Sequence, residues 1–359
     1  MEGHDDLDYL SSWGLSRLIS VQMALRAAIE LDVFNNIANS GPKAQLSAAE
    51  IVSKIPTTNP SAAAALDRIL RMLSANALLT ASLRPCPNGE MRQESVYGLT
   101  DETRCLLTDK GGNSTAPMTV FLSEKEVVDS FYMLKDAVLE PGCTPFEKAN
   151  GASFFDYTSK KPELSQLFNE AMATSTKVFF DKVLKTYAGF EEVKELLDVG
   201  GGFGTSIKKI VSTYPHIHGV NFDLPHVISD APKYPDVEHV AGNMFESVPN
   251  AQAILLKRIL HDWDDDRCMK LLRNCCKALP DNGKVIVVEF VIPEELGNNA
   301  DSLNSTASDY LMMVWLPGAK ERTMAEFDDL AKIAGFAETK FFPIGQGIYV
   351  MEFYKRATR

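Results

Sequence analysis

The stretch Leu196-Leu197-Asp198-Val199-Gly200-Gly201-Gly202-Phe203-Gly204-Thr205 decides the fold of this chain. Its first four residues form an apolar run that predicts a short buried strand. The glycines break that strand, and residues 206–212 return to a composition that suits a helix. A strand, a glycine turn and a helix in this order direct backbone N–H groups and a helix N-terminus toward a nucleotide-like ligand. We therefore predict an α/β sheet with its ligand site at this turn.

The spacing of the glycines narrows the class of ligand. Gly200, Gly202 and Gly204 form a Gly-x-Gly-x-Gly pattern, and Thr205 stands where a dinucleotide fold places its third glycine. The pattern is closer to the loop that holds S-adenosylmethionine. Because many turns are rich in glycine without binding a ligand, a bare turn is an equal alternative on this evidence alone.

Length and charge limit the class of protein. The chain has 359 residues, 45% of them hydrophobic, so two domains with a sizeable core are expected. The net charge of −12 disfavours a nucleic-acid partner, because phosphate binding needs clustered Lys and Arg side chains.

No segment is typical of export or of membrane insertion. The start, Met1 to Asp8, is acidic, whereas a signal peptide opens with a basic segment and an apolar one. No run approaches the ~20 apolar residues that span a bilayer. The six cysteines show no metal-ligand spacing. We therefore expect reduced thiols in a cytoplasmic protein.

Start and turn signals in the first third predict short helices followed by a β-hairpin. Ser47 and Glu50 are placed for a capping box, and Asn59-Pro60 predicts the start of the next helix. Two short strands are expected at 78–81 and 96–99, around a polar loop. This order of elements is typical of a winged-helix domain, which we delimit at 1–115.

Such a domain has two interpretations. The first is DNA binding, with residues 60–77 as the recognition helix, and the acidic charge of the chain weighs against it. The second is homodimerisation. Apolar residues recur at helical spacing over 15–31 and leave a face that needs a cover, so the second interpretation is preferred.

Residues 116–359 are predicted to form the α/β domain, with 116–190 as a helical region at its start. That region is rich in aromatic and Met side chains, which form either ordinary core or an apolar pocket for a flat ligand. The further strands of the sheet are predicted at 219–223, 237–240, 253–257 and 285–288, followed by an antiparallel pair at 340–343 and 348–354.

Polar residues follow several of these strands. Asp223 ends the second one, 23 residues after Gly200, where a ribose diol would lie in such a fold. The alternative for Asp223 is a cap on the helix after Pro225. Asn243 and Met244 follow the third strand, where the amide can accept from an adenine amine and the thioether can lie on the ring.

His261 follows the fourth strand and faces the same predicted crevice. Imidazole is the side chain best suited to take a phenol proton near neutral pH, although a lone histidine is more often structural. Glu289 ends the fifth strand and Glu321 lies further along the chain. Carboxylates on either side of an imidazole would orient it and stabilise its protonated form. The alternatives are a surface charge at the strand end for Glu289 and a charge at a helix start for Glu321.

Taken together, these runs resemble the plant S-adenosylmethionine-dependent O-methyltransferases of the caffeic acid type. The matching segments are 197–202, 221–228, 242–245, 261–263 and 320–323, which read LDVGGG, NFDLPHVI, GNMF, HDW and KERT. The resemblance covers nearly the whole chain and implies a Rossmann-like sheet with helices on both faces, plus an N-terminal winged-helix dimerisation domain. The start, from residue 15 to residue 31, looks most like columbamine-type enzymes of protoberberine alkaloid pathways.

The resemblance also implies roles for individual residues. It makes His261 the general base with Glu289 and Glu321 beside it. It implies cofactor contacts at Gly200, Asp223, Leu224, Asn243, Met244 and Lys257, and substrate contacts at Phe121, Leu122, Phe168, Met172, Asp262, Met312 and Leu316. It implies a phenolic small molecule as substrate, S-adenosylhomocysteine as product, no metal, no nucleic acid and no membrane.

Several positions depart from the family pattern. Asn243 stands where most members have Asp, and we expect a changed cofactor affinity because the amide is uncharged. Leu122, Leu316 and Ser175 replace polar groups of the monolignol enzymes. A site with fewer donors favours a more apolar, polycyclic phenol, and an isoquinolinium would gain from stacking on Phe121 and Trp315.

The sequence thus predicts a cytoplasmic, homodimeric phenol O-methyltransferase that acts on a benzylisoquinoline or protoberberine alkaloid. A caffeic acid, phenylpropanoid or flavonoid substrate is the alternative within the same chemistry. A winged-helix regulator with a degenerate methyltransferase domain, and a dehydrogenase, are the alternatives from other classes.

Overall fold

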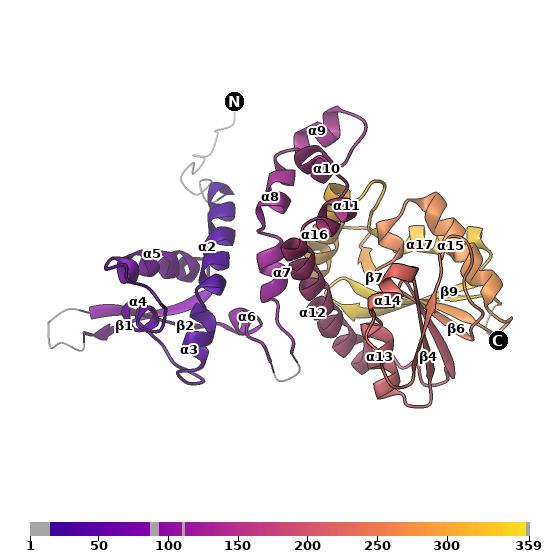
Figure 1. Cartoon of the computed structure of the whole chain (residues 1–359), viewed down its shortest axis with the longest axis horizontal. Coiled ribbons are helices and arrows are strands. Elements are labelled where there is room, and N and C mark those ends of the chain that lie inside the picture. The colour runs from indigo at the N-terminus through magenta and orange to yellow at the C-terminus, as the bar shows by residue number, and fades with distance from the viewer. Residues whose placement is uncertain (1–14, 87–92, 110–111, 357–359) are drawn as a thin grey trace, which may run out of the picture. The chain divides into compact units, whose positions relative to one another are not determined.

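The computed structural model describes residues 15–86, 93–109 and 112–356 (Figure 1). The chain divides into two compact units, of which the first holds Met1–Val127 and Glu163–Ser175 and the second holds Val128–Pro162 and Thr176–Arg359. The predicted domain boundary at residue 115 stays a prediction. The expectation about an export signal at Met1 to Asp8 falls outside the described residues.

The first unit is mainly helical and carries one β-hairpin. Its elements are η1 (Leu15–Arg17), α2 (Leu18–Glu30), α3 (Val33–Ala38), α4 (Ala48–Val52), α5 (Ala62–Ala75), β1 (Leu79–Pro85), β2 (Gln93–Leu99), α6 (Asp101–Arg104) and α7 (Ala116–Phe121). The strands β1 and β2 pair antiparallel, as the winged-helix pattern predicts. Buried side chains of α2, α3, α4, α5 and the hairpin form one core.

Of the two helix starts discussed next, the predicted start of α4 is confirmed and that of α5 is wrong. The capping box at α4 is confirmed, because Ser47 Oγ accepts from the Glu50 N–H and the Glu50 carboxylate accepts from the Ser47 N–H. The predicted start of α5 at Asn59-Pro60 is wrong by about two residues. The Asn59 side chain accepts from the Ser61 N–H in a turn before the helix, so it satisfies the turn rather than the first helical N–H groups.

A run of helices leads into the second unit. They are α8 (Lys125–Phe131), α9 (Leu134–Leu139), α10 (Pro145–Asn150), α11 (Phe154–Ser159) and α12 (Pro162–Thr186). Capping hydroxyls of Thr144 and Ser153 start α10 and α11. Within the described ranges, no helix combines the length and the apolarity needed to cross a bilayer.

The second unit is built on an eight-stranded sheet with the order β5-β4-β3-β6-β7-β10-β9, and β8 pairs with β7. The strands are β3 (Glu195–Val199), β4 (His218–Asp223), β5 (Val237–Ala241), β6 (Ala253–Lys257), β7 (Lys284–Ile292), β8 (Arg322–Thr323), β9 (Glu338–Gly345) and β10 (Ile348–Tyr354). The first five are parallel, and β10 runs antiparallel to β7 and β9. The predicted strands are thereby confirmed, except that the fifth continues past Glu289 to Ile292.

Helices cover both faces of this sheet (Figure 1). They include α13 (Thr205–Thr213), α14 (Pro225–Asp230), α15 (Asp265–Ala278), α16 (Ala300–Trp315) and α17 (Met324–Ala334). One buried cluster packs α15 and α17 against the sheet, and another packs α13 and the end of α12 against it. The Rossmann-like architecture predicted from the sequence is therefore present.

The strand order reverses at the centre of the sheet. The chain passes from β3 outward to β4 and β5, then returns to the other side of β3 to form β6 and β7. Ligands of open α/β sheets bind beyond the carboxyl ends of strands at such a reversal. The residues that follow β3, β4, β5 and β6 therefore border the candidate site.

Candidate active site

The glycine turn after β3 requires glycine on two separate grounds. Gly200, Gly202 and Gly204 have φ angles of +71°, +58° and +78°, a backbone region that other residues rarely adopt. At Gly201 the limit is space, because an added Cβ would lie 2.1 Å from Asn221 Oδ1. An added Cβ at Gly202 would meet no atom of the described chain within 4 Å, so the turn is open on that side.

Asp223 ties the end of β4 to this turn. Its Oδ2 accepts from the Gly202 N–H at 2.8 Å, and its Oδ1 accepts from the Leu224 N–H at 2.7 Å. The alternative of a helix cap is wrong, because α14 has no side-chain cap. Asp223 is half-buried and Leu224 is exposed, so both border the open side of the turn.

The other predicted cofactor residues also lie at the carboxyl edge of the sheet. Asn243 follows β5, and its Oδ1 accepts from the Phe245 N–H at 3.0 Å while its amide donates to Glu246. Met244 lies half-buried against the core. Lys257 ends β6, and its Nζ donates to the Thr176 hydroxyl at 2.8 Å. Burial lowers the pKa of Lys257 to about 8.

Two unpaired buried acceptors lie beside Gly201 of the glycine turn, and an unpaired buried acceptor suits a partner with donor groups. Among the residues that the structure describes, Asp198 Oδ2 and Asn221 Oδ1 have no hydrogen-bond partner. Burial raises the pKa of the Asp198 carboxyl, which the Lys257 charge partly offsets. Asp198 lies in the strand end that precedes the glycines, and the sequence predicted no contact for its side chain.

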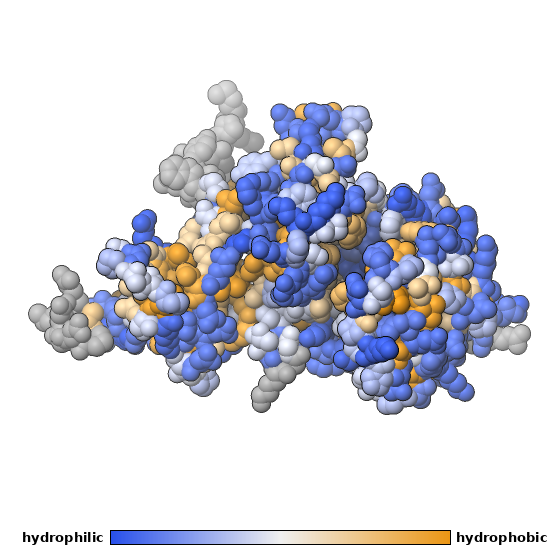
Figure 2. Space-filling model, viewed as in Figure 1, coloured by the Kyte–Doolittle hydropathy of each residue, from blue (hydrophilic) through white to orange (hydrophobic). Residues whose placement is uncertain are grey.

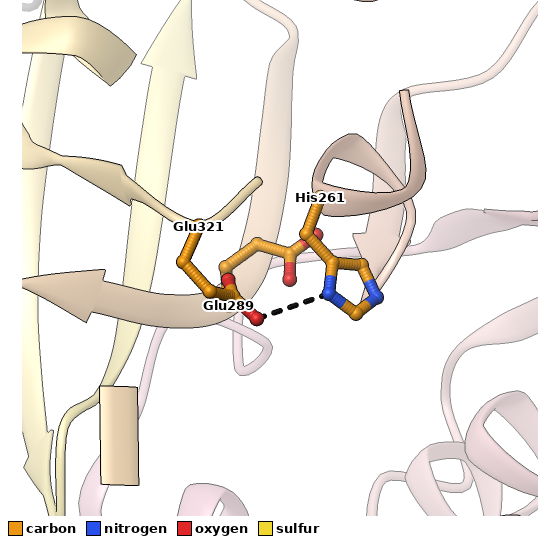
Figure 3. A group of neighbouring side chains, drawn as sticks. All are labelled: His261, Glu289 and Glu321. Atoms are coloured by element: carbon orange, nitrogen blue, oxygen red, sulfur yellow. Dashed lines mark hydrogen bonds and ion pairs between the residues drawn. The ribbon is translucent and has the colours of Figure 1, made fainter. Parts of the chain in front are cut away.

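His261 lies in a short 3-10 helix, η2 (Leu260–Asp262), directly beyond β6. Its Nδ1 lies 3.0 Å from Glu321 Oε1 (Figure 3), and its Nε2 lies 3.3 Å from Asp262 Oδ1. An ionised carboxylate only accepts hydrogen bonds, so we assign the ring proton to Nδ1. In the neutral ring this leaves the lone pair on Nε2, the atom suited to take a proton.

Glu321 and Glu289 make different contacts near His261: one with its ring and the other with the backbone. Glu321 is fully buried and contacts the ring, as the sequence predicts. Glu289 is also fully buried, so the alternative of a surface charge is wrong. Its Oε1 accepts from the N–H groups of Ile259 and Leu260 at 2.8 and 3.0 Å. Glu289 therefore holds the backbone before the histidine, and no hydrogen bond joins it to the ring in the described structure.

Arg258 is a site residue that the sequence argument missed. Its guanidinium donates to Glu321 Oε1 at 2.8 Å and to the Ser308 hydroxyl at 2.8 Å, and it lies 3.8 Å from Glu289 Oε2. The side chain also covers the Phe290 ring, 4.8 Å from its centroid. One cation thus lies between two buried carboxylates, and no local sequence signal predicted it.

Burial and the neighbouring charges shift the pKa values of Glu289, Glu321 and His261. Burial raises the pKa of Glu289. Burial alone would also raise that of Glu321, but Arg258 and His261 outweigh it and hold its pKa well below the ordinary value. Burial and Arg258 lower the pKa of His261, whereas the surrounding carboxylates raise it, and the result lies above the ordinary value. The histidine is therefore poised to accept a proton.

Arg322 is a second residue that the sequence argument did not assign. It is fully buried, and it donates to the carbonyl oxygens of Leu260 and Trp263, each at 2.8 Å. It also forms a two-pronged ion pair with Asp265. Arg322 therefore holds the backbone on both sides of His261.

The predicted substrate residues belong to two groups. Phe121, Leu122, Phe168 and Met172 lie in the first unit, and Asp262, Met312 and Leu316 lie in the second. The Phe121 and Phe168 rings are 5.3 Å apart, and Met312 is buried near the end of α16. Phe121 and Trp315 are buried, and Trp315 stacks on Phe154 with 5.2 Å between centroids. Neither ring offers the free stacking face that the sequence argument expected.

The comparisons with known proteins cover both parts of the chain. Residues 131–337 match the family model of the O-methyltransferase domain, and residues 13–109 match that of the O-methyltransferase dimerisation domain. The fold is similar to that of human N-acetylserotonin methyltransferase, with 23% identity, a TM-score of 0.80 and 99% of this chain and 100% of that one covered.

Curated relatives cover almost the full chain. An (S)-scoulerine 9-O-methyltransferase of Coptis japonica is 58% identical over 355 residues, which are 99% of this chain and 91% of the relative. A caffeic acid 3-O-methyltransferase of Medicago sativa is 46% identical over 334 residues, 93% of this chain and 91% of the relative. The chain therefore belongs to the S-adenosylmethionine-dependent O-methyltransferases of plants.

Proposed function

We propose that this O-methyltransferase methylates a phenolic hydroxyl of a benzylisoquinoline or protoberberine alkaloid, with His261 as the general base. The similarity to the scoulerine enzyme, 58% against 46% for the caffeic acid enzyme, carries the choice of substrate class. The hydrogen bond from His261 Nδ1 to Glu321 carries the choice of base.

We propose the glycine turn and the strand ends around it as the cofactor site. Gly200, Asp223 and Leu224 border the open side of the turn, and Asn243, Met244 and Lys257 extend the site to β5 and β6. The buried acceptors Asp198 Oδ2 and Asn221 Oδ1 suit the donor groups of S-adenosylmethionine. That cofactor supplies a methyl group already activated by a positively charged sulfur.

The protein's task is then to align the phenol and to remove its proton. His261 Nε2 accepts the phenol proton, and the Glu321 carboxylate stabilises the charged ring that results. Asp262, 3.3 Å from Nε2, lies where it can meet oxygens of the substrate. Phe121, Leu122, Phe168, Met172, Met312 and Leu316 remain the proposed substrate contacts.

Replacement of the base tests this mechanism. His261→Ala should lower kcat by about 10²–10⁴-fold, because the variant lacks the ring nitrogen that accepts the phenol proton. Binding of S-adenosylhomocysteine, measured by calorimetry, should stay within about twofold of the wild type, since the cofactor residues are untouched. Near-normal turnover of the variant would refute the role of His261.

A direct competition tests the substrate class. The enzyme is given (S)-scoulerine or caffeic acid with a donor labelled on its methyl group, and kcat/KM is measured for each. We expect scoulerine to be the better substrate by at least about tenfold. A higher value for caffeic acid would reverse the assignment and favour the phenylpropanoid alternative.

We propose that the reaction requires no metal ion. His261, Glu289 and Glu321 lie within 4.8 Å of one another and form a possible ligand set. The Arg258 guanidinium already contacts Glu321 and lies beside Glu289, so it supplies the positive charge that these carboxylates need. Turnover should therefore be unchanged after dialysis against EDTA. Loss of activity that Mg²⁺ restores would contradict this proposal.

We also propose that two copies of the chain pair through the α2 face of the first unit. The dimerisation-domain match supports pairing, and apolar side chains lie exposed along η1 and α2 (Figure 2). They are Leu15, Leu18, Ile19 and Met23. A cytoplasmic location is proposed on the free thiols, since all six cysteines are unpaired.

A further inference from the structure

We infer that His239 and Asn221 are positioning residues that fix the glycine turn and thereby set the affinity for the cofactor. The inference rests on the proposed function, which places the cofactor at this turn. It is carried by a series of hydrogen bonds that runs from the Pro232 carbonyl through both side chains to the Gly202 carbonyl.

The Pro232 carbonyl determines the tautomer of His239. The ring Nε2 lies 3.0 Å from that oxygen, which can only accept a hydrogen bond, so Nε2 carries the proton. In the neutral ring Nδ1 is then an acceptor. It lies 3.1 Å from Asn221 Nδ2, and the two residues are paired neighbours on β5 and β4.

The tautomer of His239 in turn determines the orientation of the Asn221 amide. An acceptor at Nδ1 requires the NH₂ group of the amide on that side, and its second N–H donates to the Gly202 carbonyl at 2.9 Å. The reversed amide would place an oxygen against the Gly202 oxygen. Asn221 is fully buried, so a lost hydrogen bond there would not be replaced by bulk water.

Gly202 is consequently held at both of its backbone polar groups, one in each of the peptide units that flank its Cα. The Asp223 carboxylate accepts a hydrogen bond from the Gly202 N–H, and the Asn221 amide donates one to the Gly202 C=O. Residues 221 and 223 point to the same face of β4 because side chains alternate along a strand. Gly202 has a φ of +58°, and the turn around it also contains the backbone hydrogen bonds Gly200 N–H to Phe222 and Gly204 N–H to Gly201. The contacts from Asp223 and Asn221 add the side-chain restraints on Gly202 itself.

The surroundings of His239 keep the ring in place. A Cβ added at Gly204 would lie 3.3 Å from its Cε1, and the Tyr234 ring lies 6.2 Å away, centroid to centroid. Lys208 Nζ covers that tyrosine at 4.5 Å. The ring therefore has its nitrogen partners already set before any ligand binds.

Two matched variants separate the two hydrogen bonds of the ring. His239→Asn keeps an acceptor near the Nδ1 position and so keeps the bond to Asn221. His239→Gln keeps a donor near the Nε2 position and so keeps the bond to Pro232 alone. The dissociation constant of S-adenosylhomocysteine is measured by calorimetry for both, after thermal unfolding shows that each variant is folded.

We expect His239→Asn to bind within about twofold of the wild type and His239→Gln to bind about five- to tenfold more weakly, the effect of one hydrogen bond. At saturating donor, kcat should be unchanged in both. In an Asn221→Ala background, His239→Gln should add no further loss, because the ring acts through Asn221.

Equal affinities of the two His239 variants, or a better affinity of His239→Gln, would overturn the inference. Asp223→Ala distinguishes this from a failure of the proposed cofactor site. If that variant binds S-adenosylhomocysteine as the wild type does, the cofactor lies elsewhere and the proposed function fails. If it loses affinity while the His239 variants stay equal, only the positioning role fails.

Discussion

At the scale of the single residue, Arg258 shows how a strained position serves the site. Its φ is +56°, a left-handed value that costs about 1–3 kcal/mol for a residue with a side chain. The turn directs the guanidinium to Glu321 and Ser308. Without this cation, two buried carboxylates would face each other and the histidine without a charge to balance them.

Arg258→Gln should therefore change the pH dependence of the reaction. The cation lowers the pKa of His261, so its removal raises that pKa and keeps the base protonated to higher pH. The acidic limb of the kcat/KM profile should move to higher pH, and the loss of activity should be greater at pH 6.5 than at pH 9. An unchanged limb, or one that moves to lower pH, would contradict the role assigned to Arg258.

The pair Glu289 and Glu321 illustrates what residue types alone can predict. Both were expected near His261 because carboxylates suit an imidazole, and both are buried there. The different hydrogen-bond partners of the two carboxylates were not predicted. They depend on which carboxylate meets the ring and which meets the backbone N–H groups of Ile259 and Leu260.

At the scale of the element, η2 has little stability of its own because it is only three residues long. Distant residues hold it instead. The Glu289 carboxylate accepts hydrogen bonds from the N–H groups of Ile259, just before η2, and of Leu260. The Lys320 N–H donates to the His261 carbonyl at 3.0 Å. The Arg322 guanidinium donates to the carbonyls of Leu260 and Trp263. His261, the proposed base, thus lies on an irregular segment that hydrogen bonds from distant residues hold in place.

Arg322→Lys tests this support. One ammonium group cannot reach the three acceptors that a planar guanidinium joins, so η2 should loosen and kcat should fall about tenfold or more. The affinity for S-adenosylhomocysteine should stay within about twofold of the wild type. Asp265→Asn, at a more exposed partner of Arg322, should lower kcat in the same direction by a smaller factor. If kcat is unchanged in both folded variants, Arg322 has only a general role in stability.

At the scale of the whole molecule, the chain combines a catalytic unit with an N-terminal unit that exposes an apolar face. Burial of such a face against a second copy is favourable by about 25 cal/mol per Å² of apolar surface. Leu15 and Leu18 are 74% and 65% exposed and lie in one short stretch with the exposed Ile19 and Met23, and a grouped apolar surface of this kind is typical of protein–protein contacts.

Leu18→Lys should therefore weaken the dimer, because two-fold pairing brings the new charges into one apolar interface. Light scattering coupled to size exclusion should show a dimer for the wild type and a dissociation constant raised at least about hundredfold for the variant. Leu83→Lys is the matched control, since Leu83 is equally exposed on β1, outside the proposed face. A dimeric Leu18→Lys protein, or a monomeric Leu83→Lys protein, would place the interface elsewhere.

The sequence by itself determined the positions of the strands of the sheet along the chain, the glycine turn and the histidine that follows the fourth strand. These features are local: an apolar run, a glycine spacing and a histidine directly after a strand are each readable within about ten residues. The same local reasoning misjudged the start of α5, where Asn59 serves a turn and Ser61 precedes the helix. The same reasoning also ended the fifth strand at Glu289, because charged side chains are normally exposed to solvent.

Only the tertiary structure decided which side chains complete the site. Arg258 meets Glu321 across 63 residues of sequence, and His239 meets Asn221 across 18 through the register of two strands. No local pattern encodes such pairs, because they arise when the strands align and bury their polar groups together. A buried donor must then find an acceptor within reach, and that requirement, rather than composition, assigned Arg258, Arg322 and Asn221 their partners.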